Sequence, residues 1–237
     1  AHRWMACPPS ATLETQFSDT TSEAAREGTL AHEICEIKAR QKLLKKGELG
    51  YLQKAAATRE LNRLRKDPLY AEEMETCSDD YAEELYTNWM EFPEKPHVYL
   101  EVKVDLSDWI PEGFGSADCI MIGGDKLLVV DYKHGKGVEV SAEENPQMRL
   151  YALGALEIFD GIYDIEDVQM TIFQPRKANV SVSEMDTKTL YRWADTDLYE
   201  KAEMAYAGTG DFHCGEWCRF CKAKAECRER ANANMEL

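Results

Sequence analysis

The sequence GSADCIMIGGDKLLVVDYK, residues 115–133, decides the fold class. It contains two apolar runs, one from Gly115 to Ile122 and one from Lys126 to Lys133. Between them lies Gly123-Gly124-Asp125, and a glycine-rich turn between two apolar runs is typical of a β-hairpin. The segment therefore predicts two adjacent antiparallel strands.

Apolar periodicity on both sides of this hairpin predicts further strands and helices. Every second residue from Val98 to Val104 is apolar, as in a half-buried strand, and Asp167 to Phe173 alternates in the same way. Helical spacing predicts helices over residues 22–46, 79–92, 143–159 and 185–207, with a surface helical insertion over 47–92. This order of elements is that of an α/β or α+β fold, and 237 residues fit one domain, 1–237, with an N-terminal helical region.

Composition restricts the class of protein and its compartment. The chain has no run of about 18 apolar residues, and AHRWMACPPSA at its start lacks the features of a signal peptide. We therefore expect a protein that does not enter membranes and that works in the cytoplasm. The net charge of −16 argues against a broadly basic surface for nucleic acid. A local groove or a catalytic metal can still supply positive charge.

The predicted hairpin contains an acidic group with the chemistry of a metal site. Asp118 lies in its first strand, and Asp131 and Lys133 lie two residues apart, hence on one face, in its second. Hard carboxylate ligands suit Mg²⁺ or Mn²⁺, and a lysine beside them can stabilise negative charge on a phosphate. The alternative is that both acids are exposed strand residues and Lys133 is their solvated partner. We favour a site, because carboxylates within apolar strands need a partner or a metal.

The C-terminal residues contain the most specific pattern in the chain. Cys218, Cys221 and Cys227 have the spacing Cys-x2-Cys-x5-Cys. In a cytoplasmic protein such grouped thiolates bind zinc or an iron–sulfur cluster more often than they form disulfides. The pattern alone does not separate these two metals, and a fourth ligand must come from elsewhere in the chain.

Four elements in this order resemble the RecB-type branch of the PD-(D/E)XK nucleases: Gly28-x3-His32, the acid Asp118, Asp131-Tyr132-Lys133 and Gln147-x3-Tyr151. The resemblance implies a restriction-endonuclease-like core, with a central mixed sheet flanked by helices. It further implies that His32, Asp118 and Asp131 bind the metal with the backbone carbonyl of Tyr132, and that Lys133 is the catalytic lysine. Gln147 and Tyr151 would face the site, whereas Glu101 would only flank it.

The cysteine spacing also resembles the iron–sulfur members of that branch, which include the AddB nuclease domain and a CRISPR-associated exonuclease family. The resemblance implies a [4Fe–4S] cluster held by Cys7, Cys218, Cys221 and Cys227, which clasps the N-terminal end of the domain to residues 214–230. Cys214 and His213 compete with Cys7 for the fourth position, and Cys35 is a further candidate. We expect the role of the cluster to be structural.

These features predict a Mg²⁺- or Mn²⁺-dependent DNA exonuclease that hydrolyses phosphodiester bonds at the ends of linear DNA. The resemblance extends to exonucleases of phage and prophage recombination. It implies a bacterial host cytoplasm and a single-strand annealing protein as partner. The alternative is a non-catalytic nucleic-acid-binding protein whose cysteines hold zinc or iron–sulfur. An electron carrier is disfavoured because a redox role leaves the acidic hairpin unexplained. The oligomeric state is not predicted.

Overall fold

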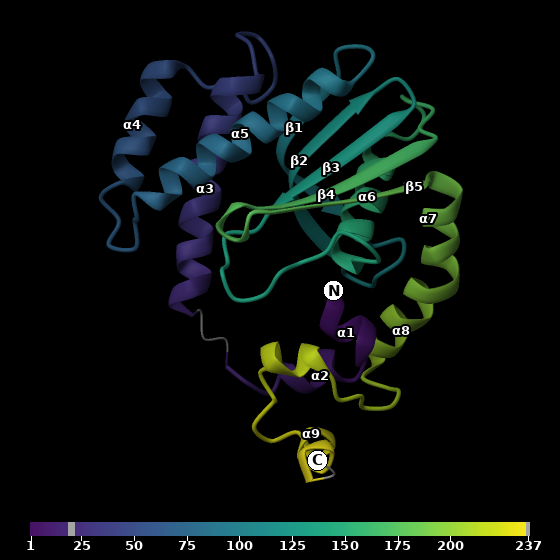
Figure 1. Ribbon diagram of the computed structural model, residues 1–237. Coiled ribbons are helices and arrows are strands. Elements are labelled where there is room, and N and C mark those ends of the chain that lie inside the picture. The colour runs from purple at the N-terminus through teal and green to yellow at the C-terminus, as the bar shows by residue number, and fades with distance from the viewer. Residues whose placement is uncertain (19–21, 236–237) are drawn as a thin grey trace.

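A five-stranded mixed sheet forms the centre of the computed structural model, which describes residues 1–18 and 22–235 (Figure 1). Its strand order is β1-β2-β3-β4-β5; the β3–β4 pair is parallel and the other pairs are antiparallel. The predicted hairpin is β2–β3, and β3 is the central strand. The strands are β1 His97–Asp105, β2 Phe114–Gly123, β3 Lys126–Tyr132, β4 Asp167–Gln174 and β5 Asn179–Asp186. The α+β class and the central mixed sheet are thus as predicted.

Helices surround the sheet, and several begin at residues that cap them. The hydroxyl of Ser22 accepts a hydrogen bond at the start of α3, and the side chains of Asn145 and Asp186 do so for α6 and α7. The α-helices are α1 His2–Ala6, α2 Ser10–Glu14, α3 Glu23–Leu43, α4 Lys54–Leu64, α5 Glu73–Glu91, α6 Pro146–Phe159, α7 Thr187–Trp193, α8 Tyr199–Ala207 and α9 Arg228–Met235. Shorter turns are η1 Pro175–Lys177, the π-helical η2 Ala194–Leu198 and η3 Glu216–Phe220.

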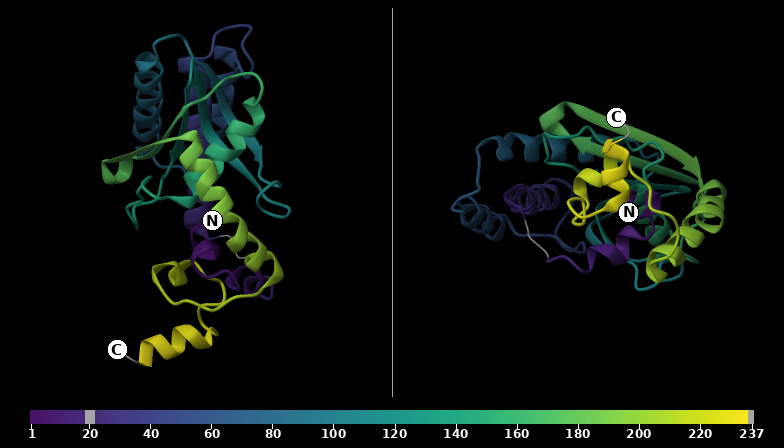
Figure 2. Two further views of the ribbon diagram at one scale, coloured as in Figure 1. Left: turned by 90° about the vertical axis from the view of Figure 1, so that its right-hand side faces the viewer. Right: turned by 90° about the horizontal axis from the view of Figure 1, so that it is seen from below.

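Each face of the sheet is covered by its own apolar core (Figures 1 and 2). Helices α3 and α5 cover one face, where Ile34, Leu85 and Val130 are buried together. Helix α6 covers the other face with Leu153, against Val129 and Ile172. Because both faces are buried, β3 and β4 are buried along almost their whole length.

The apolar side chains of β1 change from one face of the sheet to the other at Glu101, which the sequence alternation did not predict. Val98 and Leu100 pack in the α3–α5 core, whereas Val102 and Val104 pack in the α6 core. At the change, Glu101 has a φ of 54°, the left-handed conformation that residues other than glycine rarely adopt. The prediction that these four residues share one face was therefore wrong.

Four other expectations need correction. Residues 47–92 are not only a surface insertion, because α5 begins at Glu73 and buries Met74 and Leu85 in the core. Strand β4 is buried on both faces rather than alternating. Strand β5 was not predicted. Residues 185–207 are not one helix, since the chain continues β5 to Asp186 and then forms α7, η2 and α8.

Helices α1 and α2 and the C-terminal residues form a separate layer, which lies below the sheet in the view of Figure 1. Helix α1 contacts α8, η3 and α6, and α2 contacts α8. Seen from below in Figure 2, the N-terminal helices and the C-terminal residues lie side by side. We call residues 214–230 the cysteine knuckle. Within the described residues, no helix has the length and apolar character needed to cross a membrane.

Candidate metal centre

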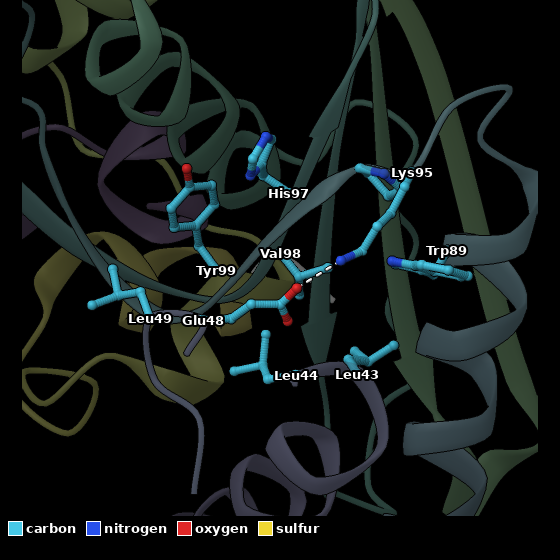
Figure 3. Close-up of a pocket in the computed structure, with 10 residues that line it drawn as sticks. Leu43, Leu44, Glu48, Leu49, Trp89, Lys95, His97, Val98 and Tyr99 are labelled. Atoms are coloured by element: carbon cyan, nitrogen blue, oxygen red, sulfur yellow. Dashed lines mark hydrogen bonds and ion pairs between the residues drawn. The ribbon is translucent and has the colours of Figure 1, made fainter. Parts of the chain in front are cut away.

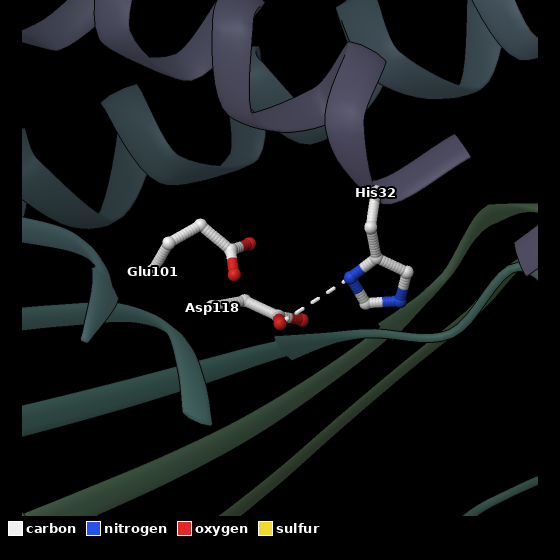
Figure 4. A group of neighbouring side chains, drawn as sticks. All are labelled: His32, Glu101 and Asp118. Atoms are coloured by element: carbon white, nitrogen blue, oxygen red, sulfur yellow. Dashed lines mark ion pairs between the residues drawn. The ribbon is translucent and has the colours of Figure 1, made fainter. Parts of the chain in front are cut away.

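Three potential metal ligands from three different elements converge on the α3 side of the sheet (Figure 4). They are His32 of α3, Glu101 of β1 and Asp118 of β2, and their donor atoms all lie within 4.8 Å of one another. His32 Nδ1 is 3.3 Å from Asp118 Oδ1. Glu101 and Asp118 lie between the paired residues Leu100–Cys119 and Val102–Ala117, and both side chains lie near His32 (Figure 4).

The space between these side chains has the size of one small ion. A cavity of about 10 Å³ is lined by His32, Glu101 and Asp118, together with Tyr132 and residues of α3 and α5. That volume is close to what one water molecule occupies. Two ligands on opposite sides of one Mg²⁺ are about 4.2 Å apart, so the observed spacing fits a single divalent ion after small side-chain movements. The residues present therefore fit a hard divalent cation with mixed oxygen and nitrogen ligands.

A second group of polar side chains begins at Asp131 in the next strand. Asp131 is only 3% exposed, and its Oδ2 lies 2.9 Å from Lys133 Nζ. Lys133 Nζ also donates a hydrogen bond to Gln147 Oε1 (3.1 Å), and Gln147 Nε2 donates to Tyr151 Oη (2.8 Å). Gln147 and Tyr151 are one turn apart on α6, so the helix aligns both with the lysine.

The two groups are connected through Asp118. The backbone N–H of Tyr132, the residue between Asp131 and Lys133, donates to Asp118 Oδ2 (2.7 Å). The ring of Tyr132 is buried in the α3–α5 core and meets the His32 ring edge to face, with 5.2 Å between ring centroids. The structure thus brings together the sequence-predicted residues His32, Asp118, Asp131, Lys133, Gln147 and Tyr151.

Burial and mutual repulsion shift the protonation of these acids toward neutral pH. Burial, with repulsion from Asp118 and Glu36, raises the pKa of Glu101 to about 7. Burial also raises the pKa of Asp131 to about 6, against the opposing attraction of Lys133. For His32 and Lys133, burial alone would lower the pKa, but the neighbouring carboxylates outweigh it and raise the pKa of both. The carboxylates of Glu101, Asp118 and Asp131 therefore concentrate negative charge in this group, as expected of a cation site.

Sequence reasoning missed part of this arrangement. Glu101 was expected only to flank the site, yet it belongs to the ligand group. A supporting network behind Tyr132 was also missed: Tyr132 Oη lies 2.8 Å from His134 Nδ1, and His134 Nε2 lies 3.5 Å from Glu27. Arg176 pairs with Glu27 (2.9 Å) and so links η1 to α3. The isolated positions of these residues in the sequence gave no signal of the network.

Five cysteines line a single small cavity in the layer below the sheet. They are Cys7, Cys214, Cys218, Cys221 and Cys227. Backbone N–H groups point at two of the sulfurs: His213 N lies 3.5 Å from Cys7 Sγ, and Gly215 N lies 3.4 Å from Cys218 Sγ. Cys35 is excluded from this group, because it is buried in the α3–α5 core.

The cysteine spacing can be compared with the geometry of the two candidate metals. In tetrahedral zinc sites Zn–S bonds of 2.3 Å place the sulfurs about 3.8 Å apart. Cys214 Sγ and Cys218 Sγ are 3.9 Å apart, but no three cysteine sulfurs of residues 1–18 and 22–235 lie within 4.8 Å of one another. A four-iron cluster carries each thiolate on a different iron and so separates them more widely. The donor set, with its N–H···S contacts, fits such a cluster better than one zinc ion.

Residues of the N-terminal helices hold the knuckle in place. Glu14 is almost buried, and its carboxylate accepts the backbone N–H of Lys222 (2.5 Å) and pairs with Arg3 (2.7 Å). Arg3 in turn donates to the Ser10 carbonyl (2.9 Å), close to Cys7. This contact between residues 14 and 222 was not predicted from the sequence.

A separate cavity of about 310 Å³ lies at the outer edge of β1 (Figure 3). Trp89, His97 and Tyr99 contribute to its lining, and an ion pair between Lys95 and Glu48 (2.6 Å) crosses it. Its one carboxylate is already paired, so this lining does not form a second group of converging acids.

Comparison with known proteins gave two findings. A family model described as "Protein of unknown function (DUF2800)" matches residues 1–237. A solved structure described as "Crystal structure of SSO0001" is 13% identical to this chain, with 83% of this chain and 85% of that chain covered and a TM-score of 0.35.

Proposed function

The chain belongs to the DUF2800 family, whose description assigns no activity, and from its site we propose that it is a divalent-metal-dependent DNA nuclease. One observation carries the proposal. Three ligands with donor atoms within 4.8 Å of one another lie beside a buried carboxylate that is paired with a lysine. A site for binding nucleic acid alone has no need of such a group, because phosphate is held by cations rather than acids.

His32, Glu101 and Asp118 would hold the ion, with Asp131 and the Tyr132 carbonyl as further ligands. A bound Mg²⁺ or Mn²⁺ would neutralise charge on the scissile phosphate and make a nearby water more acidic. Lys133 would donate hydrogen bonds to a phosphate oxygen as its negative charge increases. Asp131 and Gln147 fix the position of the lysine ammonium group, and Tyr151 fixes the amide of Gln147.

We also propose a [4Fe–4S] cluster held by Cys7, Cys218, Cys221 and Cys227. It is supported by the single cavity that these cysteines share and by the absence, within the described residues, of three sulfurs within 4.8 Å of one another. Cys214 lines the same cavity and remains the competing ligand. Since Cys7 and Cys227 are 220 positions apart in the sequence, the cluster would act as a structural clasp.

The wider setting is also a proposal. We propose an exonuclease that degrades linear DNA from its ends in phage or prophage recombination, in a bacterial cytoplasm, together with a single-strand annealing protein. The resemblance of the sequence elements supports this setting, and the acidic surface would suit a basic protein partner.

The decisive experiment is digestion of end-labelled linear DNA and of circular DNA by anaerobically purified protein with Mn²⁺ or Mg²⁺. We expect wild-type protein to degrade the linear substrate, and Lys133→Ala to lose at least 100-fold in rate, as do enzymes that lose one charge-stabilising donor. Lys126→Ala is the matched control, because Lys126 begins the same strand and pairs instead with Gln169 and Glu184.

The same assay tests the alternative function. If folded, iron-replete wild-type protein degrades no DNA under any of these conditions but still binds it, the chain is a nucleic-acid-binding protein with a cysteine-bound metal. Equal activity of wild type and Lys133→Ala would instead place the activity outside this site.

A further inference from the structure

A second cavity adjoins the candidate catalytic residues on the α6 side. It has a volume of about 330 Å³ and is lined by residues of α1, of the β1–β2 connection and of α6. Gln147 and Tyr151 belong both to this lining and to the hydrogen-bonded group that begins at Lys133. The cavity therefore adjoins the hydrogen-bonded group that contains Lys133.

The lining of this cavity is aromatic on its walls and polar along one edge. Trp4, Phe114 and Tyr151 contribute rings, and Leu106, Ile110 and Leu150 contribute aliphatic surface. Phe114 is 84% exposed although it begins a strand of the central sheet. The amide of Gln147, the hydroxyl of Tyr151 and the side chain of Glu112 contribute the polar groups.

The segment that presents Phe114 is held firmly by backbone hydrogen bonds. Leu106 N donates to Gly113 O (3.0 Å), Ile110 N to Leu106 O (2.8 Å), and Gly113 N to Ile110 O (2.7 Å). A Cβ added to Gly113 would lie 2.6 Å from Ile110 Cβ, so the close approach requires glycine. The exposure of Phe114 is thus fixed by the fold of this connection.

The absence of a side chain at Gly115 allows the ring of Tyr151 to lie close to strand β2. A Cβ at this position would lie 2.7 Å from Tyr151 Cε1, so the ring of Tyr151 packs directly on the backbone of β2. Phe114 and Tyr151 both contribute to the lining of the cavity.

We propose that this cavity binds one unpaired nucleobase of the DNA strand whose phosphate is cleaved, with Phe114 as the stacking residue. The inference rests on the proposed nuclease function. A nucleobase has a flat apolar face and a polar edge, which suits a lining of aromatic rings with an amide, a hydroxyl and a carboxylate. The volume is at the lower end of the range for small-molecule sites. A paired base would have its polar edge occupied, so the base must leave the duplex before it enters.

Binding of oligodeoxynucleotides that contain one 2-aminopurine at successive positions tests the proposal. The Lys133→Ala protein would be used with Ca²⁺, so that the strand is bound and not degraded. We expect one position at which the 2-aminopurine fluorescence changes strongly. Adding Phe114→Ala should abolish that change and weaken binding about 5- to 100-fold, the range for loss of one base–aromatic stack, whereas Phe114→Trp should retain both.

A second comparison separates base stacking from general damage. An abasic nucleotide at the sensitive position should weaken binding to the parent protein as much as Phe114→Ala does, and should have little further effect in that variant. Ile162→Ala is the matched control, because Ile162 is 71% exposed and lies beyond the opposite end of α6. It should behave as the parent protein.

Each result has a defined meaning. The proposal is overturned if no position is sensitive, or if Phe114→Ala still discriminates against the abasic strand. A position-specific signal from a protein that cleaves no DNA would support the base site while the nuclease function fails. Cleavage without any position-specific signal would retain the nuclease and remove the base site.

Discussion

Glu101 combines an unusual backbone with a place in the ligand group. Its φ of 54° lies in a region that costs a non-glycine residue about 1 kcal/mol or more. Glycine would adopt this conformation freely, yet it has no carboxylate to place beside His32 and Asp118. The strain is thus consistent with a residue retained for its side chain.

We predict that Glu101→Gln weakens divalent-metal binding at least tenfold and reduces nuclease activity with it. The amide keeps the shape of the side chain but removes one negative charge from the ligand group. Calorimetric titration with Mn²⁺ measures the affinity. Glu112→Gln is the control, since Glu112 has a similar φ of 58° but is not in the ligand group. Equal Mn²⁺ affinity in wild type and Glu101→Gln would show that Glu101 does not bind the ion.

The raised pKa values predict how pH affects the metal-free protein. Glu101 has a pKa of about 7 in the fold against an ordinary value of 4.5, and Asp131 about 6 against 3.8. The folded state therefore binds more protons than the unfolded state across this range. The stabilisation of the folded state by the two protonated groups is fully present below about pH 4 and is lost as pH rises toward 7.

A comparison of melting temperatures checks this dependence. In the absence of metal, Glu101→Gln should become more stable relative to wild type as pH rises from 4.5 to 7.5, because only wild type must charge the carboxyl. Saturating Mn²⁺ should reverse the order at pH 7.5. A constant difference between the two proteins across this pH range would contradict the raised pKa.

At the residue scale, sequence reasoning predicted most of the residues that the structure brings together, because their order along the chain carried the information. Asp118, Asp131 and Lys133 stand in apolar strands, where charge is conspicuous. Glu101 stands in a run where every second residue is charged or polar, so an exposed glutamate was the simpler interpretation. Glu101 reaches His32 and Asp118 only because the side chains of β1 change face at this residue.

At the scale of elements, helix α6 lies very close to strand β1 at one glycine. Gly154 faces β1, and a Cβ there would lie 2.6 Å from Val104 Cβ. We predict that Gly154→Ala destabilises the fold by about 1–3 kcal/mol, although alanine favours helices. Urea unfolding measures the loss. Gly28→Ala in α3 is the control, because nothing lies within 4 Å of its added Cβ, and it should not destabilise. An unchanged unfolding midpoint for Gly154→Ala would refute the tight packing.

The contact between Gly115 of β2 and Tyr151 of α6 sets how closely these two elements pack. A Cβ at Gly115 would displace the ring of Tyr151 and break its bond with Gln147, which in turn holds Lys133. Gly115→Ala should therefore lower kcat for DNA more than it lowers stability. Activity and urea unfolding measured on the same preparation separate the two effects. Loss of both in proportion would indicate damage to the fold alone.

Strand β5 shows why one element could not be predicted. Its valines face outward, with Val180 and Val182 about half exposed, while Ser181 and Ser183 face the protein. Ser181 accepts the backbone N–H of Ala142, so a polar contact takes the place of apolar burial. The hydrophobic pattern of the strand is therefore the reverse of what alternation rules expect.

For the whole molecule, the two ends of the chain are joined by polar contacts around the cysteine cavity. We predict that Glu14→Ala destabilises this layer by about 1–3 kcal/mol, because Arg3 and the Lys222 N–H lose their acceptor. Limited proteolysis should then cut within the cysteine knuckle, whereas the exposed Glu94→Ala control should remain resistant. Identical digestion patterns for both variants would count against the role of Glu14.

Removal of iron provides the corresponding test of the clasp. Chelation, or Cys7→Ser, should lower the melting temperature and expose the knuckle to protease while leaving the sheet folded, because the sheet has its own two cores. If iron removal changed neither the melting transition nor protease resistance, the cluster would have no structural role.

The position of α1 and α2 also determines when their contacts can form during biosynthesis. Both helices precede α6, α8 and η3 in the chain, yet α1 contacts all three and α2 contacts α8. At about 5–20 residues per second, the ribosome needs roughly 10–40 s to add the intervening chain. Trp4 and Met5 pack in the core that contains α6, so both lack these partners until α6 has been made. Helices α1 and α2 are therefore open to chaperones and proteases during part of synthesis.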